Sequence, residues 1–333
     1  MDYSLIVCTY NPDERLLNRC LKAIAKLDLE GLKTEVILVD NNSTQPLNTL
    51  PYVLSYLNLI TNARYIIVKE QGLSYARKAG IEVSRGKHTV FFDDDNEPDP
   101  NYLQVLKRLH EGYPHVGAWG PGNVAVEFID GVDTELETYA REAFQERHEE
   151  NLVYANIRKS QSIYPNGTGL CIKHELLLEY IARISDGTYT LTGRKGRQLT
   201  SGEDTQMILL CIELGYAAGV APNLKVIHII PSKRANYNYL KRHAYGGIRD
   251  YALSVCQVFP EQRDIMARDL LSPSKFFRRS LKKFIRSNLG KSKLKTLETI
   301  FYMSLNMGIY DISGKPIPKF AYHFLCYLGL KKI

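Results

Sequence analysis

The chain has 333 residues, of which 44% are hydrophobic and 24% charged, so it can bury a sizeable core and is not a disordered protein. Glycine and proline are near average usage, which excludes collagen-like and low-complexity classes, and no apolar run reaches the roughly 18 residues of a membrane-spanning helix. The net charge of +7 is unevenly distributed, because residues 232–333 carry 20 basic and 6 acidic side chains whereas residues 1–231 carry 23 and 30. We therefore expect two parts, a domain over 1–231 and a helical basic region over 232–333.

The cysteines and the N-terminus predict the cellular compartment. The six cysteines are widely spaced and contain no C-x-x-C pair, which favours reduced core thiols over a zinc site or a disulfide framework; they are Cys8, Cys20, Cys171, Cys211, Cys256 and Cys326. The N-terminal MDYSLIVCTYN has no basic stretch ahead of its apolar run, so it is typical of a first strand and not of a signal peptide. We expect a cytoplasmic protein.

Strand and helix patterns alternate along the first 120 residues. Apolar runs rich in β-branched and aromatic residues predict strands at 4–8, 35–39, 65–68, 89–92 and 116–119, and helical patterns fall at 13–27, 72–84 and 99–112. This alternation predicts an α/β fold with a mostly parallel sheet flanked by helices. Ligands of such sheets bind beyond the carboxyl ends of the strands.

The later part is less regular, with helices predicted at 133–150, 173–183 and 203–214, a strand at 223–228, and helical patterns from 236 onward. Residues 272–295 hold nine basic side chains and no acidic one, with apolar residues at helical spacing among them. Such a helix suits the surface of an anionic membrane. It equally suits a solvated helix whose apolar stripe packs on the main domain, and the pattern favours neither.

Three carboxylates, Asp93, Asp94 and Asp95, directly follow the apolar run at 89–92. Alternate residues of a strand point the same way, so Asp93 and Asp95 can face one site. One or two carboxylates together with substrate phosphates are the usual way in which proteins hold Mg²⁺, and Mn²⁺ also takes oxygen ligands. The alternative is a solvated acidic turn that caps the next helix.

Two further positions carry candidate chemistry. Glu203 and Asp204 open a predicted helix, whose dipole keeps a first-turn carboxylate ionised and able to take a proton from a hydroxyl. Ser201 and Asp204 also have the spacing of a helix cap. The spacing alone favours this cap over a catalytic base. His228 ends the run LKVIH, and a single histidine at a strand end is more often structural than a metal ligand.

In this order the motifs resemble those of the inverting nucleotide-sugar glycosyltransferases of glycosyltransferase family 2, which have the GT-A fold. CTYN ends the first predicted strand, VDNNS the second, and QGLSYARKAG opens the helix at 72–84. FFDDDNEPDP supplies the metal motif, and NGTGLCIK, SGEDTQM and VIH follow it. The resemblance spans about residues 3–230. The chain departs from the family pattern at Cys8, Gln71 and Lys78.

The resemblance implies a role for each matching residue. The nucleotide is expected to be bound by Thr9, Tyr10, Asn11, Asp40, Gly72, Arg77, Asp93 and Asp94. A divalent metal, Mn²⁺ or Mg²⁺, is expected on Asp93, Asp95 and His228. Asp204, with Glu203 beside it, is expected to deprotonate the acceptor hydroxyl.

The resemblance also implies a metal-dependent transfer from a nucleotide-sugar, by default a UDP-sugar, to a lipid-linked or polysaccharide acceptor in cell-surface glycan assembly. Residues 272–295 would then hold the protein on the inner face of the plasma membrane. No nucleic-acid partner is expected, because no known nucleic-acid module is recognised. The alternatives are a nucleotidyltransferase that makes nucleotide-sugars, whose Gly-rich and Arg-containing loop is missing here, and a non-catalytic binding module.

Overall fold

The computed structural model describes residues 1–191, 193, 199 and 201–330. The chain divides into two compact units: 1–127, 145–192 and 207–229 form the first, and 128–144, 193–206 and 230–333 form the second. The expected boundary at residue 231 lies close to the start of the last of these segments. The second unit also takes two earlier segments, which the sequence analysis assigned to the first domain.

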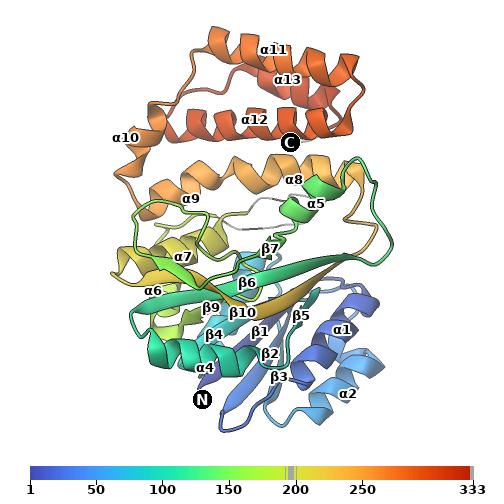
Figure 1. The fold of residues 1–333 in the computed structure, drawn as a ribbon, viewed down its shortest axis with the longest axis vertical. Coiled ribbons are helices and arrows are strands. Elements are labelled where there is room, and N and C mark those ends of the chain that lie inside the picture. Colours follow the sequence, from blue (N-terminus) through green and yellow to red (C-terminus); the bar gives the residue numbers. More distant parts are fainter. Residues whose placement is uncertain (192, 194–198, 200, 331–333) are drawn as a thin grey trace. The chain divides into compact units, whose positions relative to one another are not determined.

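A single sheet runs through the first unit in the order β3-β2-β1-β4-β9-β6-β10-β5, with β7 paired to β6 and β8 to β10 (Figure 1). The strands are β1 (Tyr3–Thr9), β2 (Thr34–Asp40), β3 (Ala63–Ile67), β4 (His88–Asp93), β5 (Asn96–Pro98), β6 (Val116–Phe128), β7 (Arg147–His148), β8 (Val153–Ala155), β9 (Cys171–Lys173) and β10 (Ala217–Ile230). Strands β1 to β4 are parallel, whereas β9 runs antiparallel to β4 and β6, and β5 antiparallel to β10. The predicted α/β class is confirmed, and its parallel part consists of the first four strands.

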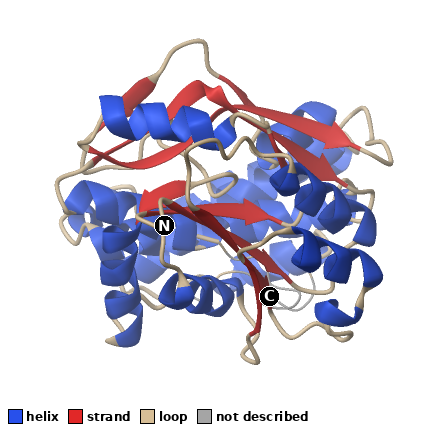
Figure 2. Cartoon of the chain, turned by 90° about the horizontal axis from the view of Figure 1, so that it is seen from below, coloured by secondary structure: helices blue, strands red, loops and turns tan. Residues whose placement is uncertain are grey.

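Helices cover both faces of the parallel strands, because successive residues of each strand point to opposite sides. Leu5 and Val7 belong to a core cluster with residues of α1 (Glu14–Ala25), α2 (Pro51–Leu59) and α4 (Tyr102–Gly112). On the other face Ile6 meets α3 (Leu73–Val83), where a Cβ on Gly80 would lie 2.8 Å from Ile6 Cγ2. Helix α6 (His174–Ser185) packs beside α3, and a short 3-10 turn spans Leu47–Thr49. Figure 2 shows this mixture of helices and twisted strands.

Two stretches differ from the sequence expectation. The helix predicted at 133–150 is only α5 (Glu137–Ala143); Gln145 has a φ of +68°, which ends the helix, and Arg147–His148 pair with β6. Helix α2 was missed, although Pro51 stands at its first turn, where proline is favoured. The strand predicted at 223–228 is part of the longer β10.

The second unit is mainly helical, and α12 packs against several of its neighbours. Its helices after α5 are α8 (Tyr237–Arg249), α9 (Tyr251–Val258), α10 (Gln262–Ala267), α11 (Pro273–Leu289), α12 (Lys293–Ile312) and α13 (Lys319–Tyr327), and α7 (Glu203–Glu213) begins in this unit and continues into the first. Figure 1 shows α11, α12 and α13 side by side in orange and red.

The aromatic stripe of the basic helix α11 packs inside the second unit. Phe276 is fully buried, with its ring centroid 5.1 Å from that of Phe320, and Phe284 stacks on Phe324 at 4.8 Å. The stripe therefore packs on α13, in the same unit, whereas the structural alternative expected it to pack on the main domain. Over the described residues, no helix combines the length and the apolar character that crossing a membrane requires.

All six cysteines are free. Four of them are buried and Cys8 is half-buried, but Cys326 is exposed on α13, so the expectation of core thiols is wrong for that residue.

Candidate active site

The carboxyl end of β2 is organised by Asp40, which is buried. Its Oδ1 accepts a hydrogen bond from the Ser43 backbone N–H at 2.8 Å, and its Oδ2 accepts from the Leu47 N–H at 3.2 Å and from the Tyr65 hydroxyl at 2.7 Å. Burial and the neighbouring Asp40 carboxylate raise the pKa of Tyr65 to about 12, so the phenol remains a donor at neutral pH. Asp40 therefore holds the loop after β2 in place and uses its carboxylate for that contact.

Asn41 joins this loop to the segment before α3. Its Nδ2 donates to the Glu70 carbonyl at 2.7 Å, and its Oδ1 accepts from the Gly72 N–H at 2.7 Å. Gly72 has a φ of +144°, a backbone conformation that residues with a side chain rarely adopt. Asn41, which belongs to the motif VDNNS, thus connects Gly72 to the loop after β2.

Thr9 is the last residue of β1, Tyr10 follows it, and Asn11 has a φ of +45°. Thr9 Oγ1 donates to Asp94 Oδ2, which connects the ends of β1 and β4. Asn11 donates its N–H to Ser43 Oγ at 2.9 Å and accepts from the Thr44 N–H at 2.8 Å through Oδ1. Tyr10 remains 44% exposed, so its ring is available to stack on a planar ligand.

Arg77 lies close to Asp93, the last residue of β4. It is buried, its guanidinium lies over the Phe91 ring at 5.6 Å, and its Nη2 is 3.8 Å from Asp93 Oδ1. The Asp93 side chain is 35% exposed, so it contacts solvent, and the buried Arg77 guanidinium offsets its negative charge. The motif QGLSYARKAG therefore supplies a cation to the aspartate run, whereas the resemblance assigns Arg77 to the nucleotide pocket.

The pairing of β5 with β10 places His228 beside Asp95. His228 stands opposite Asn96 in the antiparallel register, and the Asp95 carbonyl accepts from the Ile229 N–H at 2.9 Å. His228 Nε2 lies 3.4 Å from Asp95 Oδ2, and both side chains are at most 5% exposed. Asn96 Nδ2 donates to Asp95 Oδ1 at 3.1 Å and so orients the carboxylate.

This donor set fits a divalent ion in part. One carboxylate and one imidazole suit Mn²⁺ better than Mg²⁺, because Mg²⁺ prefers oxygen ligands alone. Asp93 lies toward Arg77, and within the described ranges no cluster of three or more histidine, cysteine, aspartate or glutamate side chains has the arrangement of a metal site. Among the candidate site residues, Asp95 and His228 are the two side chains that could hold such an ion together.

Glu203 and Asp204 belong to the second unit and form the first turn of α7. Glu203 is buried, with Oε2 accepting from the Gly202 N–H at 3.1 Å, whereas Asp204 is half-buried and accepts from the Thr205 N–H at 2.8 Å. Ser201 Oγ donates to the Gly247 carbonyl at 3.3 Å, and Gly202 occupies the residue before the helix. The helix-cap alternative for Ser201 therefore does not describe this turn.

Sequence reasoning missed Tyr65 and Asn96, which position Asp40 and Asp95 by hydrogen bonds, and it named Asn41, which positions Gly72, only within the motif VDNNS. Asn41 and Asn96 each directly follow a singled-out aspartate, which was a usable signal. Tyr65 lies on a different strand, and nothing in its local sequence indicates its contact.

Comparison with known proteins agrees with this geometry. Residues 4–163 match the family model described as glycosyl transferase family 2. The chain is 33% identical over 102 residues to the glycosyltransferase AglE of Haloferax volcanii, covering 30% of this chain and 33% of that protein. It is 26% identical over 153 residues to EpsH of Bacillus subtilis, covering 46% of this chain and 42% of EpsH. The matches thus span less than half of these curated relatives.

Solved structures share the fold over most of the chain. S. aureus TarS superposes with a TM-score of 0.51 at 15% identity, covering 92% of this chain and 55% of TarS. A TarS 1–349 structure in complex with UDP-GlcNAc gives 0.51 at 16% identity, covering 96% and 93%. The fold is of the GT-A type, and residues 4–163 match the model of glycosyl transferase family 2.

Proposed function

We propose that this protein transfers a sugar from a UDP-sugar to an acceptor hydroxyl, with inversion at the anomeric carbon and with a divalent metal. The observation that carries the proposal is the Asp95–His228 pair, 3.4 Å apart, on the ladder that follows the Asp93–Asp95 run. The match to the family 2 model and the UDP-GlcNAc complex of TarS support the nucleotide-sugar donor.

The donor is proposed to bind where β1, β2 and β4 end. Tyr10 is the exposed aromatic for the base, the loops held by Asp40 and Asn41 surround the nucleoside, and Asp93 and Asp94 meet the ribose. Asp40 acts in this scheme through the loop that it holds. Asp95 and His228 would hold the metal, which when bound offsets the negative charge on the leaving diphosphate.

Asp204 is the proposed general base. The helix N-terminus favours its ionised form, and it is more accessible than the buried Glu203. Its carboxylate takes the proton of the acceptor hydroxyl as that oxygen bonds to the anomeric carbon. The bond from that carbon to the diphosphate oxygen breaks in the same step, and its electron pair leaves with UDP.

An anionic acceptor is proposed to meet the basic second unit. Arg278 and Lys282 are exposed on α11, beside Ile285, which is 44% exposed. If this face binds anionic lipid, Arg278→Glu with Lys282→Glu should abolish co-sedimentation with vesicles containing acidic lipid and leave UDP binding unchanged; unchanged sedimentation would remove the membrane from the proposal.

The central experiment measures thermal stability with UDP, GDP, dTDP or CDP, each with and without Mn²⁺. A ligand at 100 times its dissociation constant stabilises the folded state by about 2.7 kcal/mol, which gives a measurable melting shift. We expect a Mn²⁺-dependent shift with UDP that is lost in Asp95→Asn and retained in Asp28→Ala, a surface aspartate of the same unit. No shift with any nucleotide would overturn the donor site.

A further inference from the structure

A pocket of the second unit is lined by residues of α5, α8 and α12, and Figure 1 shows α8 lying between the other two helices. Its volume is about 250 Å³. Sites for drug-sized ligands measure roughly 300–1,000 Å³, so this pocket suits a single ring and not a long ligand. Small or aliphatic residues line part of it. The lining residues that carry chemistry are Tyr139 and Glu142 of α5, His243 and Gly247 of α8, and Phe301 of α12.

Two aromatic rings of the pocket remain open to a ligand. Phe301 is 42% exposed, although it lies on α12, whose other face is buried in the unit. Tyr139 is half-buried on the facing helix α5. The negative π face of such a ring attracts the slightly positive C–H groups on one face of a sugar ring. The pocket therefore provides a stacking platform for a flat, partly apolar ring.

Polar groups stand beside this platform. Glu142 is exposed, and among the ion pairs between described residues none includes it. Its carboxylate can accept hydrogen bonds from two hydroxyl groups. Burial, together with the charges of Glu142 and Glu298, raises the pKa of Tyr139 to about 12, so its phenol remains a donor at neutral pH. The His243 ring is held by stacking on Tyr239, with centroids 6.4 Å apart.

Gly247 keeps the α8 wall of the pocket open. Glycine is disfavoured in the interior of a helix, where Gly247 stands. The three atoms nearest to a Cβ added at this residue all belong to the His243 ring, at 3.5 to 3.8 Å, which is ordinary van der Waals contact. The fold therefore accommodates a side chain at Gly247, and that side chain would reduce the space left for a ligand.

The pocket is connected to the segment that carries the proposed general base. Ser201 Oγ donates to the carbonyl of Gly247 at 3.3 Å, and Gln206 Nε2 donates to Gln257 Oε1 on α9 at 2.6 Å. Asp204 lies between these two anchored residues, in the same unit as the pocket. The helix that forms one wall of the pocket thus also holds the first turn of α7 in place.

We propose that this pocket is a subsite for an uncharged sugar ring of the acceptor, which stacks on Phe301 and donates its hydroxyl hydrogens to Glu142. The inference rests on the proposed transfer to an acceptor hydroxyl and adds the chemical class of the group next to that hydroxyl. The Glu142 carboxylate repels a sugar that itself carries a carboxylate, so the subsite discriminates against uronic acids.

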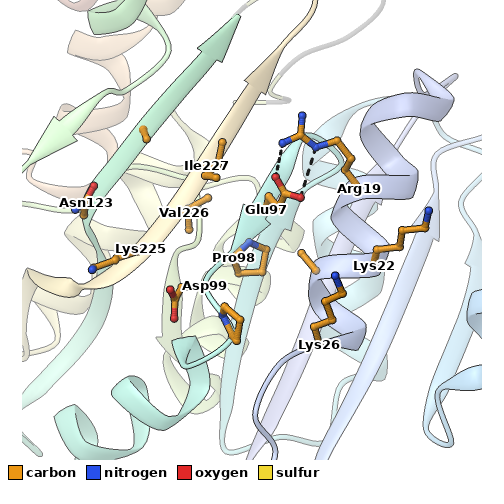
Figure 3. A pocket seen from close by; sticks show the side chains of 13 residues that line it. Arg19, Lys22, Lys26, Glu97, Pro98, Asp99, Asn123, Lys225, Val226 and Ile227 are labelled. Atoms are coloured by element: carbon orange, nitrogen blue, oxygen red, sulfur yellow. Dashed lines mark hydrogen bonds and ion pairs between the residues drawn. The ribbon is translucent and has the colours of Figure 1, made fainter. Parts of the chain in front are cut away.

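A larger groove in the first unit, between α1 and β10, offers no such platform. Its volume is about 490 Å³, and none of its described lining residues is aromatic. Arg19 is already paired with Glu97, and Figure 3 shows Lys22 and Lys225 pointing in different directions. This groove therefore has neither a ring on which a sugar could stack nor converging charges for an anion.

The test uses the methyl β-glycosides of glucose, galactose and N-acetylglucosamine, with methyl β-glucuronide for comparison, in saturation-transfer NMR and in titrations. We expect at least one of the three neutral glycosides to bind, with saturation concentrated on the protons of one ring face. The glucuronide should bind at least about fivefold more weakly than that glycoside, because of the repulsion by Glu142.

Three variants change the pocket and two serve as matched controls. Phe301→Ala and Glu142→Gln should each weaken binding of the neutral glycoside by about fivefold or more, and Gly247→Met should abolish it without lowering the melting temperature. Tyr327→Ala removes another exposed aromatic of the same unit, and Asp264→Asn another exposed carboxylate, so both should bind as the wild type does.

Four results would overturn the inference: no binding of any neutral glycoside, unchanged binding in Phe301→Ala, equally tight binding of the glucuronide, or displacement of the glycoside by UDP. UDP melting shifts should be the same in Phe301→Ala and in the wild type. A UDP shift without glycoside binding would refute this subsite alone. Glycoside binding without any UDP shift would refute the donor site of the proposed function, so the two failures are distinguishable.

Discussion

Two half-buried histidines, His88 and His110, make the stability of the first unit depend on pH. The rings of His88 and His110 stack with centroids 3.7 Å apart and planes 14° apart, and Tyr3 packs against both. Burial lowers the pKa of His88 to about 4, with the Lys173 charge adding to the effect. Burial lowers the pKa of His110 to about 3, with His88 adding to it.

The direction follows from where protons bind. Below about pH 6.5 the unfolded histidines take up protons that the folded pair refuses, so the free energy of unfolding falls as the pH falls. The full stability is present above pH 6.5, and the loss levels off once the folded pair titrates, near pH 4 to 3. At pH 5 the pH lies about 1.5 units below the ordinary histidine pKa. The free energy of unfolding is then lower by about 2 kcal/mol for each histidine and by about 4 kcal/mol for the pair.

The assay is urea unfolding at pH 7.5 and pH 5, followed by fluorescence of Trp119, the single tryptophan of the chain, which is buried in the same unit. Between pH 7.5 and pH 5 the double variant His88→Gln with His110→Gln should lose about 4 kcal/mol less free energy of unfolding than the wild type. His115→Gln, which changes an exposed histidine, should keep the wild-type pH dependence. If the wild type and the double variant lose the same stability to within about 1 kcal/mol, the assignment of the pH dependence to this pair is refuted.

Three further predictions concern positions that stabilise the interior of one unit or the other. Tyr65→Phe removes a donor to the buried Asp40 carboxylate and should destabilise the first unit by about 1–3 kcal/mol in urea unfolding, whereas Tyr10→Phe, at an exposed ring, should not. Gly72→Ala forces a side chain into a φ of +144° and should cost about 1–3 kcal/mol and weaken UDP binding, whereas Gly112→Ala, with nothing within 4 Å of the added Cβ, should be neutral or stabilising. Phe276→Ala empties the aromatic core of the second unit and should lower its unfolding free energy by about 3–5 kcal/mol, measured by circular dichroism, whereas an equal loss in Phe301→Ala, at a ring 42% exposed, would contradict the packing argument.

Much of the first unit follows from local patterns. The apolar runs that predicted the first four strands lie within β1 to β4 or overlap them. For β1, β2 and β4 the reason is that a strand buried on both faces needs a continuous apolar run. Helix α3 begins one residue after the predicted start at residue 72. The helix expected at 133–150 was largely wrong, since an acidic, helix-favouring composition cannot reveal that Gln145 reverses the backbone and that the next residues pair with β6.

The site divides in the same way. The order of motifs along the chain predicted that Thr9, Arg77 and the aspartate run belong together, and the contacts of Thr9 with Asp94 and of Arg77 with Asp93 agree with this. The resemblance gave Asp40 a nucleotide contact, but its carboxylate is turned to Ser43, Leu47 and Tyr65. A sequence motif shows which residue is present, but it does not show which hydrogen-bond donors the fold places around that residue.

By itself the sequence determined the α/β class, the family resemblance and the positions of the acidic motifs, because periodicity, helix starts and strand ends depend on residues a few positions apart. Only the tertiary structure decided that His228 meets Asp95, that the aromatic stripe of α11 is covered by α13, and that lysines of α1 and β10 line one groove. These contacts join segments far apart in the chain. Their partners are set by strand order, by register and by which faces remain to be covered, and no local pattern encodes those three choices.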